Sequence, residues 1–310
     1  MKNTIKHLLL RTSILLVTAL LVTACGEPQT IQSDSTEIAE VNYHNSTLIV
    51  DEHPGLATGG TQNFPPGRIV HYAENGEVIF ESNMLKMPHD AWSMQDGTYW
   101  VSLIRENALW HINTNSEVLG VLPIGVYPTS FSVLENGNIL VSGWDDDHPG
   151  LVREYDPTGD IVWRVEDLVW PWKAQRLANG NTMIADAGSN RVFEVAPDGT
   201  IVWEFSGLAP EKNELFEHLG PTYVDRIDNG NTLISGRGVD RIIEVDQAGD
   251  IVWEVGAPLI DAQYSAVRLK NGNTLITDQG HDRVIEIDRD KNIVWQKDGF
   301  GYAAKAYRLD

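Results

Sequence analysis

Short runs of β-branched and apolar residues, separated by turn residues, repeat along the chain from about residue 45 to its end. The tripeptide Asn-Gly-Asn marks the repeat, because each copy is followed by an apolar run, a loop, a second apolar run and then the motif "IVW". Four copies stand at intervals of 43, 50 and 42 residues, beginning at Asn136, Asn179, Asn229 and Asn271. Turn residues at this spacing predict units of four short strands joined as hairpins.

Two weaker copies of the unit precede these four. In one, "DGTYWVS" from Asp96 and "ALWHIN" from Ala108 take the places of the second and third strands. In the other, "NSTLIVD" from Asn45, "GRIVHYA" from Gly67 and "GEVIFES" from Gly76 take the second, third and fourth places. Six units of roughly 40 residues match the period of β-propeller blades, with an open solenoid as the main alternative.

The end of the chain distinguishes a closed ring from an open solenoid. The first unit lacks the opening strand that every other unit has, and the C-terminal segment "AKAYRLD", from Ala304 to Asp310, supplies that strand alone. Joined to residues from Asn45, it would complete one blade and protect its strand edge. The sequence therefore predicts an all-β fold over residues 45–310. We expect a six-bladed β-propeller of four-stranded blades, closed by the C-terminal strand joining the N-terminal blade.

Under this prediction, two conspicuous residue types have structural roles. A tryptophan recurs at the same place in the outer strand of four blades, where we expect its ring to pack between neighbouring sheets; these residues are Trp163, Trp203, Trp253 and Trp295. The Asn-Gly-Asn tripeptides supply the positive φ angles of tight turns.

The first residues have the pattern of an export signal. Lys2, Lys6 and Arg11 precede an apolar run, Ile14 to Val22, which is too short to span a bilayer comfortably and ends in small residues. The junction "VTACG" resembles the lipobox of bacterial lipoproteins, which implies cleavage before Cys25 and lipid attachment to its thiol.

This resemblance gives the domain organisation and the location. We expect a signal peptide over residues 1–24, lipidated Cys25 and a polar tether over 25–44, and the propeller over 45–310. Cys25 is the chain's single cysteine, so the mature chain has no internal disulfide. The protein would be anchored in the cell envelope. Gly26 is not the Asp that favours inner-membrane retention, so we expect the periplasmic face of the outer membrane in a Gram-negative cell, and otherwise the outer face of the cell membrane.

The charge limits the possible partners. The whole chain carries −21, and removal of three basic residues and no acidic ones with the signal peptide would take it to −24. Such an acidic surface argues against nucleic acid, which needs basic groups to displace its counterions. We expect a monomer without cofactor.

One face of the predicted propeller collects the candidate binding residues. The loops entering the innermost strands and those between the second and third strands gather there around the axial channel. Rings for stacking and cations for charge suit a small aromatic or anionic ligand. The candidates for substrate binding are Tyr127, Trp170, Trp172, Lys173, Tyr223, Arg237, Tyr264 and His281. We expect no metal, because the acidic run from Asp145 to His148 has the pattern of a solvated loop tip.

His89 is the candidate with the most direct chemical role, because it opens an innermost strand beside the channel. An imidazole there can act as a nucleophile, a general base or a metal ligand. It can equally be a structural histidine that is hydrogen-bonded to a neighbouring blade. The sequence leaves these alternatives open.

The stretch "HDAWSMQDGTYWVSLIRENALWHIN", from His89 to Asn113, resembles a blade of the bacterial arylsulfotransferases. These are periplasmic six-bladed propellers that move a sulfuryl group from an aryl sulfate to a phenol through a sulfurylated histidine. The resemblance places His89 and Arg105 on catalytic positions of that family, with Arg237 as a second match. Family members are much longer and bring further histidines from other blades, one of them the nucleophile, where this chain offers Thr129, Lys173, Thr222 and Tyr264.

By this resemblance, Arg105 would neutralise the sulfuryl oxygens with help from Lys173 or Arg237, while a histidine accepts the group. Aromatic rings would stack on the aryl group, namely Trp170, Trp172 and Tyr223. Two other classes remain open. One is a non-catalytic propeller that binds a ligand or a protein, and the other is a polysaccharide lyase-type propeller, whose anionic polymer fits the acidic chain less well.

Overall fold

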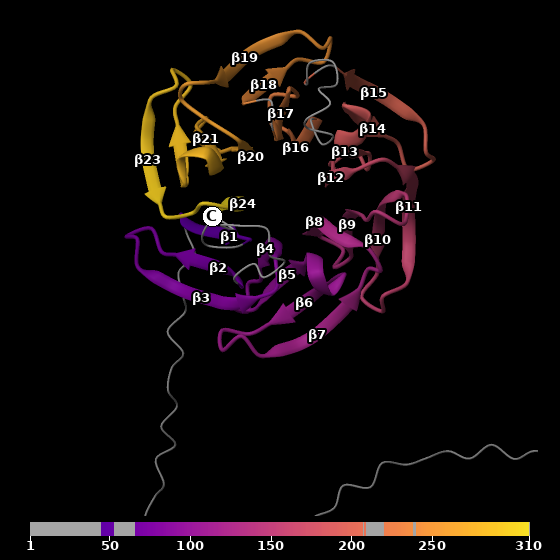
Figure 1. Ribbon diagram of the computed structural model, residues 1–310. Helices are drawn as coiled ribbons and strands as arrows, with labels where there is room; N and C mark the ends of the chain where they lie inside the picture. The colour runs from indigo at the N-terminus through magenta and orange to yellow at the C-terminus, as the bar shows by residue number, and fades with distance from the viewer. Residues whose placement is uncertain (1–44, 53–65, 207, 209–219, 238–239, 310) are drawn as a thin grey trace, which may run out of the picture. The chain divides into compact units, whose positions relative to one another are not determined.

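The computed structural model describes residues 45–52, 66–206, 208, 220–237 and 240–309, and these form six four-stranded antiparallel sheets around a common centre (Figure 1). The predicted signal peptide and tether, residues 1–44 with Cys25, lie outside the described residues. No helix among the described residues has the length and apolar character needed to cross a membrane.

Each sheet is one blade, and its strands run in chain order from the axis outward except in the first. From inner to outer strand, the first three blades contain β24 (Ala303–Leu309), β1 (Ser46–Asp51), β2 (Gly67–Tyr72) and β3 (Val78–Leu85); β4 (Pro88–Ser93), β5 (Tyr99–Leu103), β6 (Ala108–Ile112) and β7 (Val118–Pro123); and β8 (Tyr127–Val133), β9 (Ile139–Trp144), β10 (Gly150–Tyr155) and β11 (Ile161–Leu168). The other three contain β12 (Pro171–Arg176), β13 (Thr182–Asp186), β14 (Arg191–Val195) and β15 (Ile201–Ser206); β16 (Gly220–Arg226), β17 (Thr232–Arg237), β18 (Arg241–Val245) and β19 (Ile251–Gly256); and β20 (Gln263–Arg268), β21 (Thr274–Asp278), β22 (Arg283–Ile287) and β23 (Ile293–Asp298). Short 3₁₀ turns join the second and third strands of alternate blades, namely η1 (Ile104–Glu106), η2 (Ala187–Ser189) and η3 (Gln279–His281).

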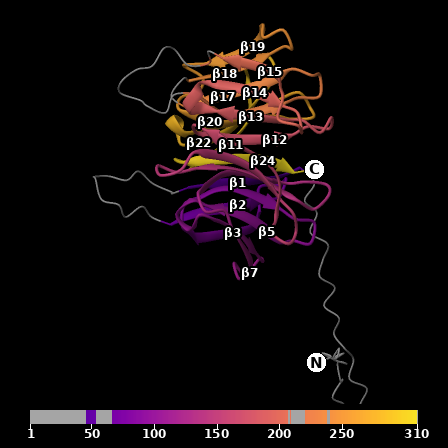
Figure 2. The ribbon, with the colours of Figure 1, turned by 90° about the vertical axis from the view of Figure 1, so that its right-hand side faces the viewer.

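The ring closes as the sequence predicts. Strand β24 pairs with β1 in a register that runs from Ser46 opposite Leu309 to Asp51 opposite Ala303. Figures 1 and 2 both show the yellow C-terminal strand beside the indigo first strand. The C-terminus therefore supplies the innermost strand of the first blade, and the prediction of a six-bladed propeller is confirmed.

The core fills the wedges between blades with side chains that suit the taper. Near the axis, where the blades converge, four inner strands bury an alanine at the same position, namely Ala91, Ala174, Ala266 and Ala306. Larger apolar residues from the second and third strands fill the wider space outside them, such as Ile234 and Ile243 in the fifth blade. Because the side chains become larger as the space between blades widens, the core can be closely packed throughout the ring.

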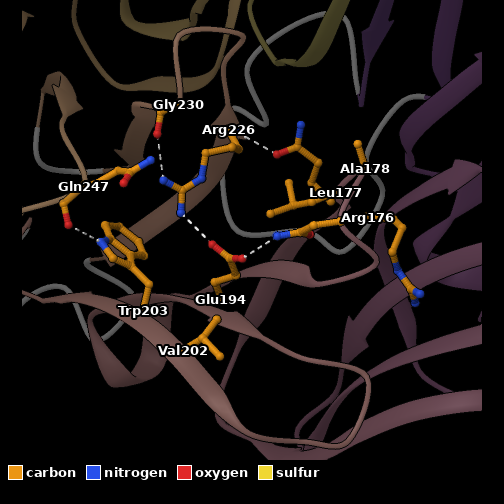
Figure 3. A pocket seen from close by; sticks show the side chains of 11 residues that line it. Arg176, Leu177, Ala178, Glu194, Val202, Trp203, Arg226, Gly230 and Gln247 are labelled. Atoms are coloured by element: carbon orange, nitrogen blue, oxygen red, sulfur yellow. Dashed lines mark hydrogen bonds and ion pairs between the residues drawn. The ribbon is translucent and has the colours of Figure 1, made fainter.

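A repeated contact between neighbouring blades includes the predicted tryptophans. In Figure 3, the Arg226 guanidinium at the end of β16 binds the Glu194 carboxylate on β14 of the preceding blade at 2.8 Å. The same guanidinium lies 4.9 Å from the ring centroid of Trp203. The Trp203 Nε1 donates to the carbonyl of Gln247 in the following blade at 3.1 Å. The expectation that this ring packs between sheets is confirmed.

The same arginine, glutamate and tryptophan contact recurs at three other blade junctions, and we call the three groups an interblade clamp. The three other clamps consist of Arg176, Glu154 and Trp163; Arg268, Glu244 and Trp253; and Arg308, Glu286 and Trp295. The Asn-Gly-Asn turn adds to each clamp: Gly180 has a φ of 86°, as predicted, and the Asn181 side chain donates to Glu194 at 2.7 Å. The last clamp joins the C-terminal strand to the sixth blade.

Candidate functional site

Three aromatic rings from alternate blades meet across the propeller axis. His89 on β4, Trp172 on β12 and Tyr264 on β20 contact one another, with ring centroids 5.2 to 5.6 Å apart. The blades that carry them are not neighbours, so these contacts are possible only across the channel. At the corresponding position, the three blades in between carry the smaller residues Thr129, Thr222 and Ala304. We call His89, Trp172 and Tyr264 the three-ring cluster.

His89 has two polar neighbours inside this cluster. Its Nε2 lies 2.7 Å from the Tyr264 hydroxyl and 3.2 Å from a carboxylate oxygen of Glu52, which follows β1. The His89 side chain is fully buried. An imidazole between a phenol and a carboxylate can accept, hold and return a proton. The sequence left two roles open for His89, a chemical one at the channel and a structural one through bonds to another blade. Its position is compatible with both, because it contacts residues of other blades and also lies in the channel.

Half-buried rings extend from the three-ring cluster on the face where the inner strands begin, which we call the loop face. Trp144, at the end of β9, lies 5.6 Å from Trp172, 5.8 Å from Trp170 and 6.1 Å from Tyr127, measured between ring centroids. The structure therefore groups Tyr127, Trp170 and Trp172 as predicted. Trp144 was not among the candidates, although its place before the acidic run from Asp145 puts it at the same loop face.

Two inner strands carry a lysine at the next position after the one that holds the three-ring cluster. Lys173 follows Trp172, and Lys305 follows Ala304. The Nζ atoms of Lys173 and Lys305 lie 5.3 and 4.8 Å from the ring centroid of Tyr223. Lys305 is fully buried and Lys173 is 7% exposed. Across the described part of the chain, neither ammonium group has a hydrogen-bond acceptor or an ion-pair partner.

Burial is the main cause that lowers the pKa of Lys305 to about 7. The ammonium loses its hydration shell, and Lys173 adds repulsion, while the carboxylates of Asp90 and Glu52 act in the opposite direction. Lys305 is a residue that the sequence analysis missed. Its place in the repeat could have indicated it, because "AAKA" near the C-terminus aligns with "PWKA" around Lys173.

A cavity of about 720 Å³ opens on the opposite face, between the turns that follow the inner strands. All inner strands run in the same direction, so the rings near their beginnings and the residues near their ends belong to opposite faces. The cavity is lined by acidic, basic and aromatic residues, among them Trp92, Lys173, Tyr223, Asp225 and Tyr307. Lys173 and Tyr223 therefore line a chamber that is reached from the face opposite to the one predicted. We call this cavity the turn-face chamber.

Other predicted site residues lie outside the channel. Arg105 is exposed on η1, and its Nε donates to the Met87 sulfur at 3.1 Å. His281, on η3, is half-exposed and its Nδ1 lies 2.9 Å from the Asp278 carboxylate. Arg237 ends β17, and its side chain lies outside the described residues. The structure thus brings His89 together with Trp172 and Tyr264 and places Arg105 and His281 at the rim.

The acidic run on the loop after β9 forms a self-contained turn. The Asp145 carboxylate accepts from the backbone amides of Asp147 and His148 and lies 2.8 Å from the His148 Nδ1. These bonds, which are stronger to a charged carboxylate, outweigh partial burial and lower the pKa of Asp145. Within the described ranges, no group of three or more His, Cys, Asp or Glu side chains is placed to hold a metal.

The chain matches no protein-family profile and no curated protein sequence. Among solved structures it is similar to a protein of unknown function from Bacteroides caccae, with a TM-score of 0.62 and 20% identity over 84% of this chain and 98% of that chain. It is also similar to a chain of a nidogen/laminin complex, with a TM-score of 0.59 and 14% identity over 84% of this chain and 96% of that chain.

A third solved structure that is similar to this chain is virginiamycin B lyase from Staphylococcus aureus, with a TM-score of 0.51 and 14% identity over 68% of this chain and 69% of that chain. These neighbours share the propeller fold and differ in what their names describe. At such low identity they support the fold alone. The resemblance to arylsulfotransferases gains no support from them.

Proposed function

We propose that the protein is an envelope-anchored propeller that binds a small aromatic ligand at the three-ring cluster and transfers a sulfuryl group from an aryl sulfate to a phenol through His89. The observation that supports this most directly is the 2.7 Å contact between His89 Nε2 and the Tyr264 hydroxyl, beside the indole of Trp172. A nucleophilic nitrogen, a proton donor and a stacking surface are the groups that such a transfer needs.

In the proposed reaction, the His89 Nε2 forms a bond to sulfur as the bond between sulfur and the aryl oxygen breaks. Tyr264 gives its proton to the departing aryl oxide. A phenol acceptor then takes the sulfuryl group from the imidazole and returns a proton to Tyr264, which restores both side chains. Because His89 is fully buried, the aryl group has to displace the half-buried ring of Trp172. Arg105 lies on η1 of the same blade, where it contacts Met87.

Release of nitrophenolate from 4-nitrophenyl sulfate, with a phenol as acceptor, tests this proposal. Purified full-length protein is expected to show acceptor-dependent turnover, and His89→Ala is expected to lose it by about 100-fold or more, because the variant has no group to accept the sulfuryl. His148→Ala is the matched control. It removes an exposed imidazole that is bonded to Asp145 on the loop after β9, and turnover should stay at the wild-type level.

Equal turnover in His89→Ala and wild type would refute the assigned nucleophile. Absence of turnover in folded wild type, across several aryl sulfate donors and phenol acceptors, would instead favour a propeller that binds without chemistry. A lyase is the second candidate, because an imidazole and a phenol in contact form an acid–base pair for elimination. Ultraviolet absorbance from a new double bond, with a polyuronate as substrate, detects that activity.

The envelope anchor is a further part of the proposal and rests on the sequence "VTACG". Bacterial cells that express the full-length chain are expected to incorporate labelled palmitate into it and to retain it in the membrane fraction. Cys25→Ala should remove both properties, because the thiol is the acceptor of the lipid. Ser33→Ala, in the same predicted tether, should leave them intact. Equal labelling of wild type and Cys25→Ala would contradict the anchor.

A further inference from the structure

We infer that the turn-face chamber is a second ligand site, which binds a small aromatic anion with its acid group at Lys173. This site is reached from the face opposite to the loop face with His89, and the inference does not depend on sulfuryl transfer. Four observations carry it: an ammonium without a partner, carboxylates that are already bonded, a second buried ammonium, and a chamber of ligand size with aromatic walls.

Lys173 lines the chamber although only 7% of its surface is exposed. Its Nζ lies 5.3 Å from the ring centroid of Tyr223, and the Asp225 carboxylate acts on it through charge without a direct ion pair among the described residues. Removing an ammonium from water is costly unless an oppositely charged or hydrogen-bonding group replaces the water. A ring face compensates only a part of this cost. Within the structure as described, the group that would complete the Lys173 site is therefore an acceptor from outside the chain.

Two carboxylates near the lysines attract them through charge, but the hydrogen bonds they accept among the described residues come from other donors. Asp90 accepts from the Tyr307 hydroxyl at 2.7 Å and from the backbone amides of Ala91 and Phe131. Asp225 accepts from the Gln175 side chain at 3.0 Å. Burial is the main cause that raises the pKa of Asp225, while the charge of Lys173 acts in the opposite direction. The group that would complete the contacts of the lysines is therefore an anion.

A second, fully buried lysine lies against Tyr223, which lines the chamber. Lys305 faces Tyr223 at 4.8 Å and Tyr264 at 5.4 Å, measured from Nζ to the ring centroids. Besides these two rings, the charged groups that act on it are Asp90, Glu52 and Lys173. Since burial leaves its pKa at about 7, an anion that enters the chamber favours the protonated form. Binding is therefore expected to be coupled to proton uptake.

The walls define the rest of the ligand. Three rings line the chamber, namely the nearly buried Tyr223, the partly buried Tyr307 and Trp92, which is 36% exposed. The volume of about 720 Å³ is within the usual range for small-molecule sites. An aromatic body with one acid group fits this combination of rings and cations. A carboxylate and a sulfate share this chemistry, so both are used as probes.

Isothermal titration of the full-length protein with 4-hydroxybenzoate and with phenyl sulfate tests the inference. We expect at least one of these anions to bind, the neutral 4-hydroxybenzamide to bind at least 10-fold more weakly, and Lys173→Met to weaken anion binding by 10-fold or more. Lys86→Met is the control, because Lys86 is an exposed cation that pairs with Glu106. His89→Ala should keep the anion affinity, which separates this site from the proposed catalytic one.

An unchanged affinity in Lys173→Met, equal binding of the amide and the acid, or no binding of either anion would overturn the inference. So would loss of anion binding in His89→Ala alone, which would place the anion at the loop face. Proton uptake gives an independent readout. At pH 8 the binding heat of wild type should vary with the ionisation enthalpy of the buffer, and Lys305→Met should remove most of that variation. A wild-type heat that is the same in all buffers would contradict the contribution of Lys305.

Discussion

Deletion of residues 303–310 is expected to abolish cooperative folding of the propeller. The deletion removes β24, whose ladder with β1 extends from Ser46 opposite Leu309 to Asp51 opposite Ala303. Each ladder hydrogen bond contributes about 1 kcal/mol, so this loss alone is comparable to the lower end of the 5–15 kcal/mol that stabilises a typical domain. Ala303, Ala304 and Ala306 are also buried, so the gap would expose the apolar surfaces against which they pack.

The deletion also removes one of the four interblade clamps. Arg308 binds Glu286 and lies 4.8 Å from the Trp295 ring centroid, so its loss leaves a partly buried carboxylate without its cation. Thermal unfolding followed by circular dichroism measures the result, with the full-length protein for comparison. Addition of a synthetic peptide of residues 301–310 should restore a cooperative transition. A truncated chain with the transition temperature of the full-length protein would show that ring closure contributes little.

The repeat made the fold predictable from sequence. Four units carry Asn-Gly-Asn before the second strand and "IVW" in the fourth, and two weaker units carry parts of this pattern, so the number and order of strands follow from the repeat. Closure followed because the C-terminal segment matched the missing strand of the first unit. The clamps were not predicted, because Arg226 and Glu194 belong to different blades and each looks like an ordinary surface residue in its own strand.

The candidate site was predictable in position and only partly in composition. His89, Trp172 and Tyr264 open inner strands, so ring symmetry brings them to the axis. The direction in which a side chain turns depends on its neighbours, and Arg105 turns to Met87 instead of the channel. Lys305 was not predicted for a different reason. The pattern of its segment indicates a strand, and only its register with Lys173 in the repeat places a second lysine in the channel.

Replacement of Lys305 by methionine is expected to stabilise the propeller by about 5 kcal/mol at pH 6. Lys305 is fully buried, and its pKa falls from 10.5 to about 7 on folding because the ammonium loses water. Each pKa unit corresponds to about 1.4 kcal/mol, and methionine fills a similar volume without a charge. Urea unfolding at pH 6 measures the gain. Lys86→Met, which removes an exposed lysine, should change stability by about 0.5 kcal/mol or less.

The pH dependence of this gain distinguishes charge burial from improved packing. The folded pKa lies below the unfolded one, so the wild-type penalty is fully present below pH 7, declines as pH rises from 7 towards 10.5 and vanishes above that value. The advantage of Lys305→Met should therefore shrink by about 3 kcal/mol between pH 6 and pH 9. Groups elsewhere titrate in both proteins and cancel in the comparison. A gain that is constant over this range would mean that the methionine acts by packing, and that Lys305 is not held as a strained ammonium. Such a constant gain would also remove the basis for coupling anion binding to proton uptake, because both effects require the same displaced proton.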